Sequence, residues 1–196
     1  MLGDVQLGEI MRQLAEKIPA DAILTNGAGN YVTWLHRHYS YRHFFRSQWA
    51  PTSGAMGYGV PAPIAAKSLY PERTVIAFAG DGCFMMSSHE IATAMQYQLP
   101  VISVVVNNGQ YGTIGMHQER HYPNRVHGTG LTNPDFPAYA RAFGAHGERV
   151  ETTDAFMPAF ERAVKSGLPA VIEIRIPPDQ STPAATLEHI RQQAKR

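Results

Sequence analysis

Two short polar motifs each follow one of the most apolar runs in this sequence. Gly80-Asp81-Gly82 comes directly after Val75–Ala79, and Asn107-Asn108 comes directly after Val101–Val106. Glycines let the backbone approach a phosphate closely, backbone amides at a helix start donate to it, and an aspartate supplies a hard oxygen ligand. This combination of residue types suits a diphosphate that is bridged by magnesium.

The two apolar runs predict adjacent strands that are buried on both faces of a parallel sheet. The carboxyl ends of such strands open at the same edge, where α/β sheets bind their ligands. Magnesium prefers near-octahedral oxygen coordination, which one carboxylate, one Asn carbonyl oxygen, one backbone carbonyl, phosphate oxygens and water would complete. We therefore expect Asp81 and Asn108 to be the side-chain ligands.

The order of apolar runs and amphipathic stretches predicts an α/β fold, with helices covering both faces of a mainly parallel sheet. A chain of 196 residues with 44% hydrophobic content has enough apolar material for one core, so we expect a single domain. The predicted helices are Leu7–Lys17, a segment carrying Tyr31, Trp34 and Leu35, Phe136–Phe143 and Asp154–Ser166; further strands are predicted at Ala22–Thr25, near Glu148 and at Ala170–Ile176.

Four further segments carry expectations about local structure. Helical spacing runs through Gly54–Tyr70, and Ser87 with Glu90 forms a capping-box pattern at the start of a helix that reaches about Gln98. Residues 109–134 lack periodicity and predict a long irregular loop, of the kind that is usually functional. The basic tail around Arg191, Lys195 and Arg196 predicts a solvated helix end.

Composition excludes several classes of function. The chain has 17 basic and 16 acidic residues, a formal charge of +1, and no concentrated Lys or Arg patch for nucleic acid or a membrane surface. No apolar run approaches the roughly 20 residues that span a bilayer. The single cysteine, Cys83, cannot form an intrachain disulfide, and the N-terminus lacks the pattern of a secretory signal, so we expect a cytoplasmic protein. Of the nine histidines, six lack the Cys or carboxylate neighbours of a typical zinc site: His36, His38, His43, His117, His121 and His127.

With residues 83–106 separating its two parts, the GDG and NN pattern resembles the signature of thiamine diphosphate enzymes. The resemblance implies a thiamine diphosphate-binding fold with three α/β/α layers. It also implies that Asp81, Asn108 and the main-chain carbonyl of Gln110 bind Mg²⁺, while Gly80, Gly82 and Cys83 lie against the diphosphate.

Two other segments resemble parts of the same family. Residues 53–67, SGAMGYGVPAPIAAK, are similar to the stretch that holds the aminopyrimidine ring in acetolactate synthases and related decarboxylases. The resemblance implies that main-chain groups of Gly54 and Met56 bind the pyrimidine and that the Met56 side chain bends the cofactor into a V. Residues 25–34 resemble a loop that contacts the diphosphate from the other side, with Gly29, Asn30 and Tyr31 at the matching places.

The resemblance to the large subunit of acetolactate synthases implies a transferase or lyase that decarboxylates 2-keto acids and joins the enamine to a carbonyl acceptor. Two departures keep other activities open: Asn30-Tyr31 replaces Gln-His, and His117 replaces a Trp of the substrate channel. One alternative is a decarboxylase without carboligation, of the benzoylformate or indolepyruvate type. Another is a stand-alone subunit of a split decarboxylase, and a third is a binding module that has lost the chemistry. Residues 117–120 could line a substrate channel or form a solvated lid.

The family binds its cofactor between two domains, and a Glu from the partner domain activates the pyrimidine. No segment of residues 1–196 matches that partner domain. The resemblance therefore implies that this chain is the C-terminal, diphosphate-binding domain, with the pyrimidine-binding and middle domains absent. It further implies a homo-oligomer, a dimer or tetramer, and little activity of the chain without the pyrimidine-binding domain of the same or a second polypeptide.

Overall fold

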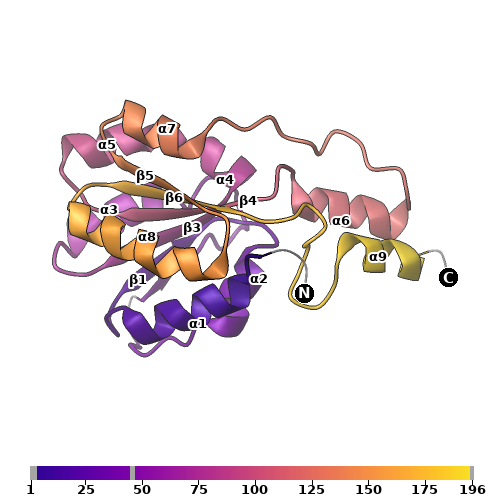
Figure 1. Cartoon of the computed structure of the whole chain (residues 1–196), viewed down its shortest axis with the longest axis horizontal. Helices are drawn as coiled ribbons and strands as arrows, with labels where there is room; N and C mark the ends of the chain where they lie inside the picture. Colours follow the sequence, from indigo (N-terminus) through magenta and orange to yellow (C-terminus); the bar gives the residue numbers. More distant parts are fainter. Residues whose placement is uncertain (1–3, 45–46, 195–196) are drawn as a thin grey trace.

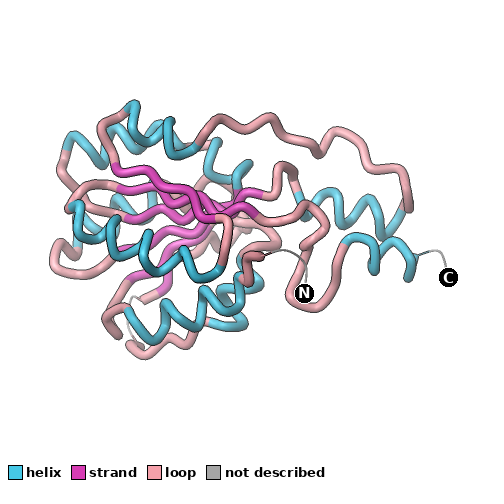
Figure 2. The backbone as a smooth tube through the Cα atoms, viewed as in Figure 1, coloured by secondary structure: helices cyan, strands magenta, loops and turns pink. Residues whose placement is uncertain are grey.

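The computed structural model describes residues 4–44 and 47–194, which fold around one six-stranded parallel sheet with the strand order β2-β1-β3-β4-β6-β5 (Figure 1). Every strand pair in this sheet is parallel. Figure 2 shows the sheet enclosed between two layers of helices. The prediction of a three-layer α/β/α fold is confirmed.

The elements follow one another in the alternation that the sequence predicts. They are α1 (Leu7–Lys17), β1 (Ile23–Asn26), α2 (Val32–His38), β2 (Gln48–Trp49), α3 (Pro61–Leu69), β3 (Val75–Gly80), α4 (Asp81–Met85), the 3-10 turn η1 (Ser88–Glu90), α5 (Ile91–Gln96), β4 (Ile102–Asn107), α6 (Gly112–His121), α7 (Phe136–Ala142), β5 (His146–Val150), α8 (Thr153–Ser166), β6 (Ala170–Arg175) and α9 (Leu187–Ala194). The longest described helix, α8, has 14 residues, and no helix within residues 4–44 and 47–194 is long and apolar enough to cross a membrane.

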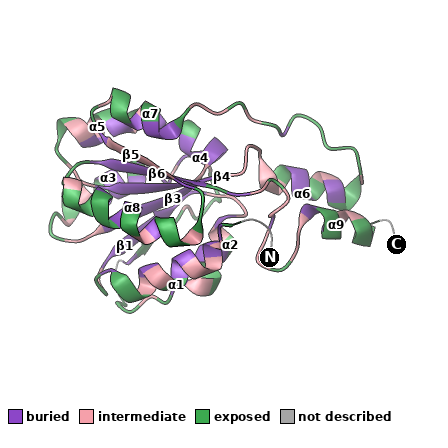
Figure 3. Ribbon diagram, in the orientation of Figure 1, coloured by how far each residue is buried: buried purple, intermediate pink, exposed green. Residues whose placement is uncertain are grey.

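Alternate residues of the central strands pack into different apolar clusters on the two faces of the sheet. Figure 3 shows that the central strands are buried. Val104 and Val106 of β4 pack on the side of α1, α2 and α8, whereas Val105 packs on the side of α4 and α7. Burial on both faces explains why the strands have continuous apolar sequences. The apolar cores hold the strands in register, and the register places the strand ends where the polar motifs begin.

The prediction of a helix through Gly54–Tyr70 is wrong in its first part, since α3 begins only at Pro61. Residues 56–60 form turns instead, and Gly54 and Gly57 have φ values of 67° and 87°. A left-handed backbone at two glycines cannot continue a right-handed helix, whereas proline is well suited to the first helical position. The turn segment therefore folds back over the end of the sheet.

The region after Gly80 also differs from its prediction. The Ser87–Glu90 capping box does not form: Ser87 makes no side-chain cap hydrogen bond, and the Glu90 carboxylate accepts from the Thr93 hydroxyl at 2.7 Å. The helical segment is divided into α4, a 3-10 turn and α5, which ends at Gln96 because Gln98 has a φ of 51°. Helix α4 thus starts at the GDG motif itself.

Residues 109–134 are not wholly irregular, because they contain α6. Its buried Met116 packs with Leu187 and Ile190 of α9, so α6 depends on a partner from the far end of the sequence. The two helices lie beside one another beyond the end of the sheet (Figure 1). Arg191, predicted to be solvated, instead pairs with the buried carboxylate of Glu119 at 2.7 Å. Lys195 and Arg196 of the predicted tail lie outside the described residues.

Gly59 provides a test of how the turn segment packs on the sheet. A Cβ at this position would lie 2.7 Å from the Gly27 amide nitrogen and 3.1 Å from the Phe78 carbonyl oxygen. Because both contacts are backbone atoms, Gly59→Ala is expected to lower the free energy of unfolding by about 1–3 kcal/mol. Urea denaturation measures this difference. Gly130→Ala is the control, since its Cβ would meet no heavy atom within 4 Å, and equal stability of the two variants would contradict the packing described.

Candidate functional site

The site lies where β3 and β4 end next to each other. The two strands pair in parallel, with Gly80 opposite Val106, so Asp81 and the Asn107-Asn108 pair leave the sheet at the same edge. The Asp81 carboxylate oxygen Oδ2 accepts a hydrogen bond from the Gly109 amide at 2.9 Å. The GDG motif therefore contacts the residue that directly follows the Asn pair, so the ends of the two strands lie side by side as the strand pattern predicts.

Asp81 is a buried carboxylate that is held by several donors. The residue is only 2% exposed. Its Oδ1 atom accepts a hydrogen bond from the Gly82 amide at 3.0 Å, and Oδ2 also accepts one from the Asn133 side chain at 2.7 Å. Burial raises the pKa of the Asp81 carboxyl above its usual value, and the hydrogen bonds from Asn133, Gly82 and Gly109 oppose that rise. A cation beside this carboxylate would favour its ionised form further.

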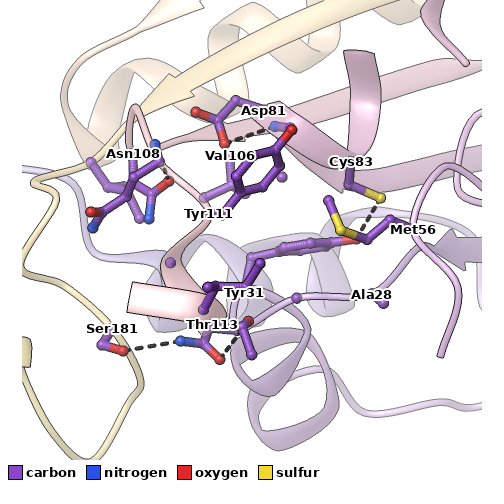
Figure 4. Close-up of a pocket in the computed structure, with 18 of the residues that line it drawn as sticks. Ala28, Tyr31, Met56, Asp81, Cys83, Val106, Asn108, Tyr111, Thr113 and Ser181 are labelled. Carbon is purple, nitrogen blue, oxygen red and sulfur yellow. Dashed lines mark hydrogen bonds between the residues drawn. The ribbon is translucent and has the colours of Figure 1, made fainter. Parts of the chain in front are cut away.

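Asn108 and Gln110 line the same pocket as Asp81 (Figure 4). The Asn108 Oδ1 atom accepts from the Gln110 amide at 3.3 Å, and the Gln110 side chain donates to the Pro178 carbonyl at 2.6 Å. Gly112 leaves room for Asn108, because a Cβ there would lie 2.8 Å from Asn108 Nδ2. The structure thus brings the three residues that are predicted to bind the metal to one pocket.

A glycine at position 82 is required by the close packing over the GDG motif. A Cβ on Gly82 would lie 2.5 Å from Tyr111 Cε1 and 3.1 Å from Leu131 Cδ1. Tyr111 lies over the motif in Figure 4, and its position is fixed by the hydrogen bond from its amide to the Thr129 carbonyl at 2.8 Å. The Tyr111 ring and the Leu131 side chain therefore occupy the space beside Gly82, and a larger residue would displace them.

The opposite wall of the pocket comes from residues 28–31 and from Met56. The Tyr31 ring lies beneath Gly80, and its hydroxyl is 3.7 Å from the Cys83 sulfur, which also accepts from the Gly57 amide at 3.2 Å. Figure 4 shows Met56 beside Cys83 and Tyr31 at the apolar end of the pocket. Gly29, Asn30, Tyr31, Met56, Gly80, Gly82 and Cys83 all line the pocket, whereas Gly54 does not and is exposed.

Asn30 joins three parts of the chain at the polar end of the pocket. Its Nδ2 donates to the Ser181 hydroxyl at 3.0 Å, and its Oδ1 accepts from the Thr113 hydroxyl at 2.9 Å. Thr113 belongs to α6 and Ser181 to the segment before α9, and both line the pocket. Asn30 therefore fixes the helix pair α6 and α9 against the end of the sheet.

Asn107 and Asn133, two polar residues to which sequence reasoning assigned no role, hold the site from behind. Asn133 donates from Nδ2 to Asp81 and to Asn107 Oδ1, at 2.7 and 3.0 Å. The Asn107 side chain turns away from the pocket and donates to Glu173 of β6 at 2.7 Å. Asn107 could have been selected by its motif position, but Asn133 lies in an aperiodic stretch with no local signal.

Residues 117–120 do not line the pocket. His117 is exposed on α6, where its ring stacks on His121 with 6.4 Å between centroids. Glu119 faces the other way, toward α9, and is 2% exposed. In residues 4–44 and 47–194, no three His, Cys, Asp or Glu side chains gather as a metal-binding group.

Several known proteins are similar in sequence to this chain over most of its length. The chain is 32% identical over 168 residues to the acetolactate synthase isozyme 2 large subunit of Escherichia coli K12, covering 85% of this chain and 31% of that protein. It is 36% identical over 173 residues to sulfoacetaldehyde acetyltransferase of Alcaligenes xylosoxydans, covering 85% and 28%. It is also 34% identical over 191 residues to pyruvate oxidase of Lactiplantibacillus plantarum, covering 94% and 31%.

The chain spans about 30% of the length of these relatives. A family model described as "Thiamine pyrophosphate enzyme, C-terminal TPP binding domain" matches residues 27–174, which include both strand ends and the opposite wall of the pocket. The chain therefore belongs to the thiamine pyrophosphate enzymes, as a C-terminal cofactor-binding domain of the acetolactate synthase-like type.

Proposed function

We propose that this chain binds the diphosphate of thiamine diphosphate through one Mg²⁺ ion, held by the side chains of Asp81 and Asn108 and the main-chain carbonyl of Gln110. The contact between Asp81 and the Gly109 amide is the observation that carries the proposal, because it holds the GDG aspartate against the loop that begins with the Asn pair. The donor set fits the ion, since carboxylate and carbonyl oxygens are the ligands that Mg²⁺ prefers.

The rest of the pocket fits the organic parts of the cofactor. Gly80 and Gly82 line the pocket without a side chain of their own, and Gly80, the N-cap residue of α4, offers no side-chain cap to the amides of the first turn. We assign Gly29, Asn30 and Tyr31 to the diphosphate side, together with Cys83. Met56 presents a bulky apolar side chain to the pocket, and we assign it and the main chain of Gly54 to the pyrimidine and its bend.

When bound, thiamine diphosphate supplies a carbon nucleophile and an electron sink that permit the loss of CO₂ from a 2-keto acid. The residues of this chain bind and orient it. Asp81 neutralises part of the metal charge, the glycines admit the phosphates, and Met56 restricts the shape of the cofactor. We propose that the complete enzyme then passes the remaining acyl unit to a carbonyl acceptor.

A second domain is part of this proposal, because no Glu, the residue type that activates the pyrimidine in this family, lines the pocket in the described part of the chain. Ile114, which lines the pocket, is 49% exposed, and Met85 and Met86 at the end of α4 are 40% and 50% exposed. These apolar groups suit a surface covered by a pyrimidine-binding domain of the same or a second polypeptide. We infer that the chain alone binds the cofactor weakly and does not complete the reaction.

Substitution of Asp81 tests the metal site. Asp81→Asn keeps the size of the side chain but removes the only anionic ligand, so the Kd for thiamine diphosphate in the complete enzyme should rise about 100-fold at fixed Mg²⁺. Isothermal titration calorimetry measures this constant. Asp154→Asn, an exposed change in the first turn of α8, is the control. Equal affinity of Asp81→Asn and wild type would refute the assignment.

A product assay tests the reaction class. We expect the complete enzyme, supplied with pyruvate, thiamine diphosphate and Mg²⁺, to form acetolactate, which chromatography with mass detection identifies. Acetaldehyde as the sole product would support the alternative of a decarboxylase without carboligation. The names of the relatives include an acetyltransferase and an oxidase, so the assay should be repeated with sulfoacetaldehyde and with phosphate under oxygen.

A further inference from the structure

Glu173 is a fully buried carboxylate in the middle of β6. It is 0% exposed and shares its side of the sheet with Val171, a member of the apolar core. Its Oε2 atom accepts from Arg149 Nε at 2.7 Å, and its Oε1 atom accepts from Arg175 Nε at 3.1 Å. A charge in such a place is costly to desolvate, and breaking such a pair is more costly than replacing it with apolar residues. A role other than stabilising the fold would therefore explain this buried carboxylate.

The same carboxylate fixes the orientation of the Asn107 side chain. Glu173 Oε1 accepts a third hydrogen bond, from Asn107 Nδ2 at 2.7 Å. An ionised carboxylate is an acceptor only, so the amide NH₂ group of Asn107 must face Glu173. The Asn107 carbonyl oxygen must then face the opposite way, toward the loop that follows β4.

The Asn107 carbonyl oxygen holds two donors that also bind Asp81. It accepts from the Gly109 amide at 3.0 Å and from Asn133 Nδ2 at 3.0 Å. The Asp81 Oδ2 atom accepts from the same two groups, at 2.9 and 2.7 Å. A flipped Asn107 amide would present its NH₂ group to these donors and would repel both of them.

We propose that Glu173 is a positioning residue for the metal-binding edge, acting through Asn107 and Asn133 on the carboxylate of Asp81. The inference rests on the proposed Mg²⁺ site, since it explains how the ligand is oriented. Glu173 reaches the site from the neighbouring strand without lining the pocket. It sets the direction of a chain of hydrogen bonds that passes through Asn107 and Asn133 and ends at Oδ2 of Asp81.

Substitution Glu173→Gln tests whether Glu173 fixes the orientation of the Asn107 side chain. Glutamine has one acceptor oxygen, which cannot serve Arg149, Arg175 and Asn107 together, so the orientation of Asn107 is no longer fixed. We expect the Kd of the complete enzyme for thiamine diphosphate with Mg²⁺ to rise about 10- to 100-fold, the usual effect of removing a group that orients a metal ligand. We also expect faster hydrogen exchange at the Gly109 amide in the cofactor-free protein.

Two further single variants separate positioning from stability. Asn133→Ala removes the side-chain amide that donates to both Asn107 and Asp81. Because Asn133 is a half-buried loop residue, this variant should fold even if Glu173→Gln does not. It should give the same rise in the Kd for thiamine diphosphate. Glu148→Gln breaks a comparable ion pair on β5, with Arg162, that has no connection to Asn107. It should lower the melting temperature but leave both the Kd and the Gly109 exchange rate unchanged.

A swapped pair tests the direction of the hydrogen bonds. Asn107→Asp alone places two carboxylates at the 2.7 Å contact and should weaken cofactor binding. Adding Glu173→Gln restores a donor that faces a carboxylate, and the carboxylate still accepts from Gly109 and Asn133. The double variant should therefore bind the cofactor more tightly than Asn107→Asp alone.

The inference is overturned if Glu173→Gln and Asn133→Ala bind the cofactor within about twofold of wild type, or if the double variant binds no better than Asn107→Asp. A wild-type enzyme with no Mg²⁺-dependent binding would instead refute the proposed function. In that case the exchange rate of the Gly109 amide still decides the positioning role: unchanged exchange in Glu173→Gln would refute it, and faster exchange would support it.

Discussion

The parallel pairing of β3 with β4 is the constraint on which the site depends. Opposite placement of Gly80 and Val106 lets both chains leave the sheet at one edge, where the Asp81 carboxylate meets the Gly109 amide at 2.9 Å. The apolar faces of both strands enforce that register, because a slip of one residue would exchange the two cores. The chemistry of the loops is thus positioned by the least polar part of the molecule.

The same arrangement creates an electrostatic cost that the structure offsets locally. A carboxylate at the end of a buried strand has a raised pKa because it is desolvated, and donors from the following loop favour its ionised form. Those donors are ordered in turn by Asn107, whose amide spans the distance to Glu173. Buried polar groups of this kind are tolerated when every member is hydrogen-bonded. Polar order therefore extends from the pocket through β4 to β6, beyond the residues that a ligand would touch.

Much of this could be predicted from sequence, for physical reasons that also mark the limit. Continuous apolar runs identified β3 and β4, and strand direction alone brought Asp81 and Asn108 together. Helix α6 was missed because its apolar contacts are few and come from α9, far away in sequence. Asn133 was missed because its partners are set only by the fold. Gly54 and Gly57 have a left-handed backbone, which helical periodicity does not reveal. The segment predicted as a helix from Gly54 is therefore not helical until α3 begins at Pro61.

In the proposed site, one divalent cation lies between the carboxyl ends of β3 and β4. The most direct test is an anomalous difference map from crystals of the complete enzyme with thiamine diphosphate, in which Mn²⁺ replaces Mg²⁺. We expect a single strong peak within coordination distance of Asp81, the Asn108 side-chain oxygen and the Gln110 carbonyl oxygen. For a metal ion of this size, the coordination distance is about 2.0–2.3 Å. A peak elsewhere, or a bound cofactor with no peak beside Asp81, would contradict it.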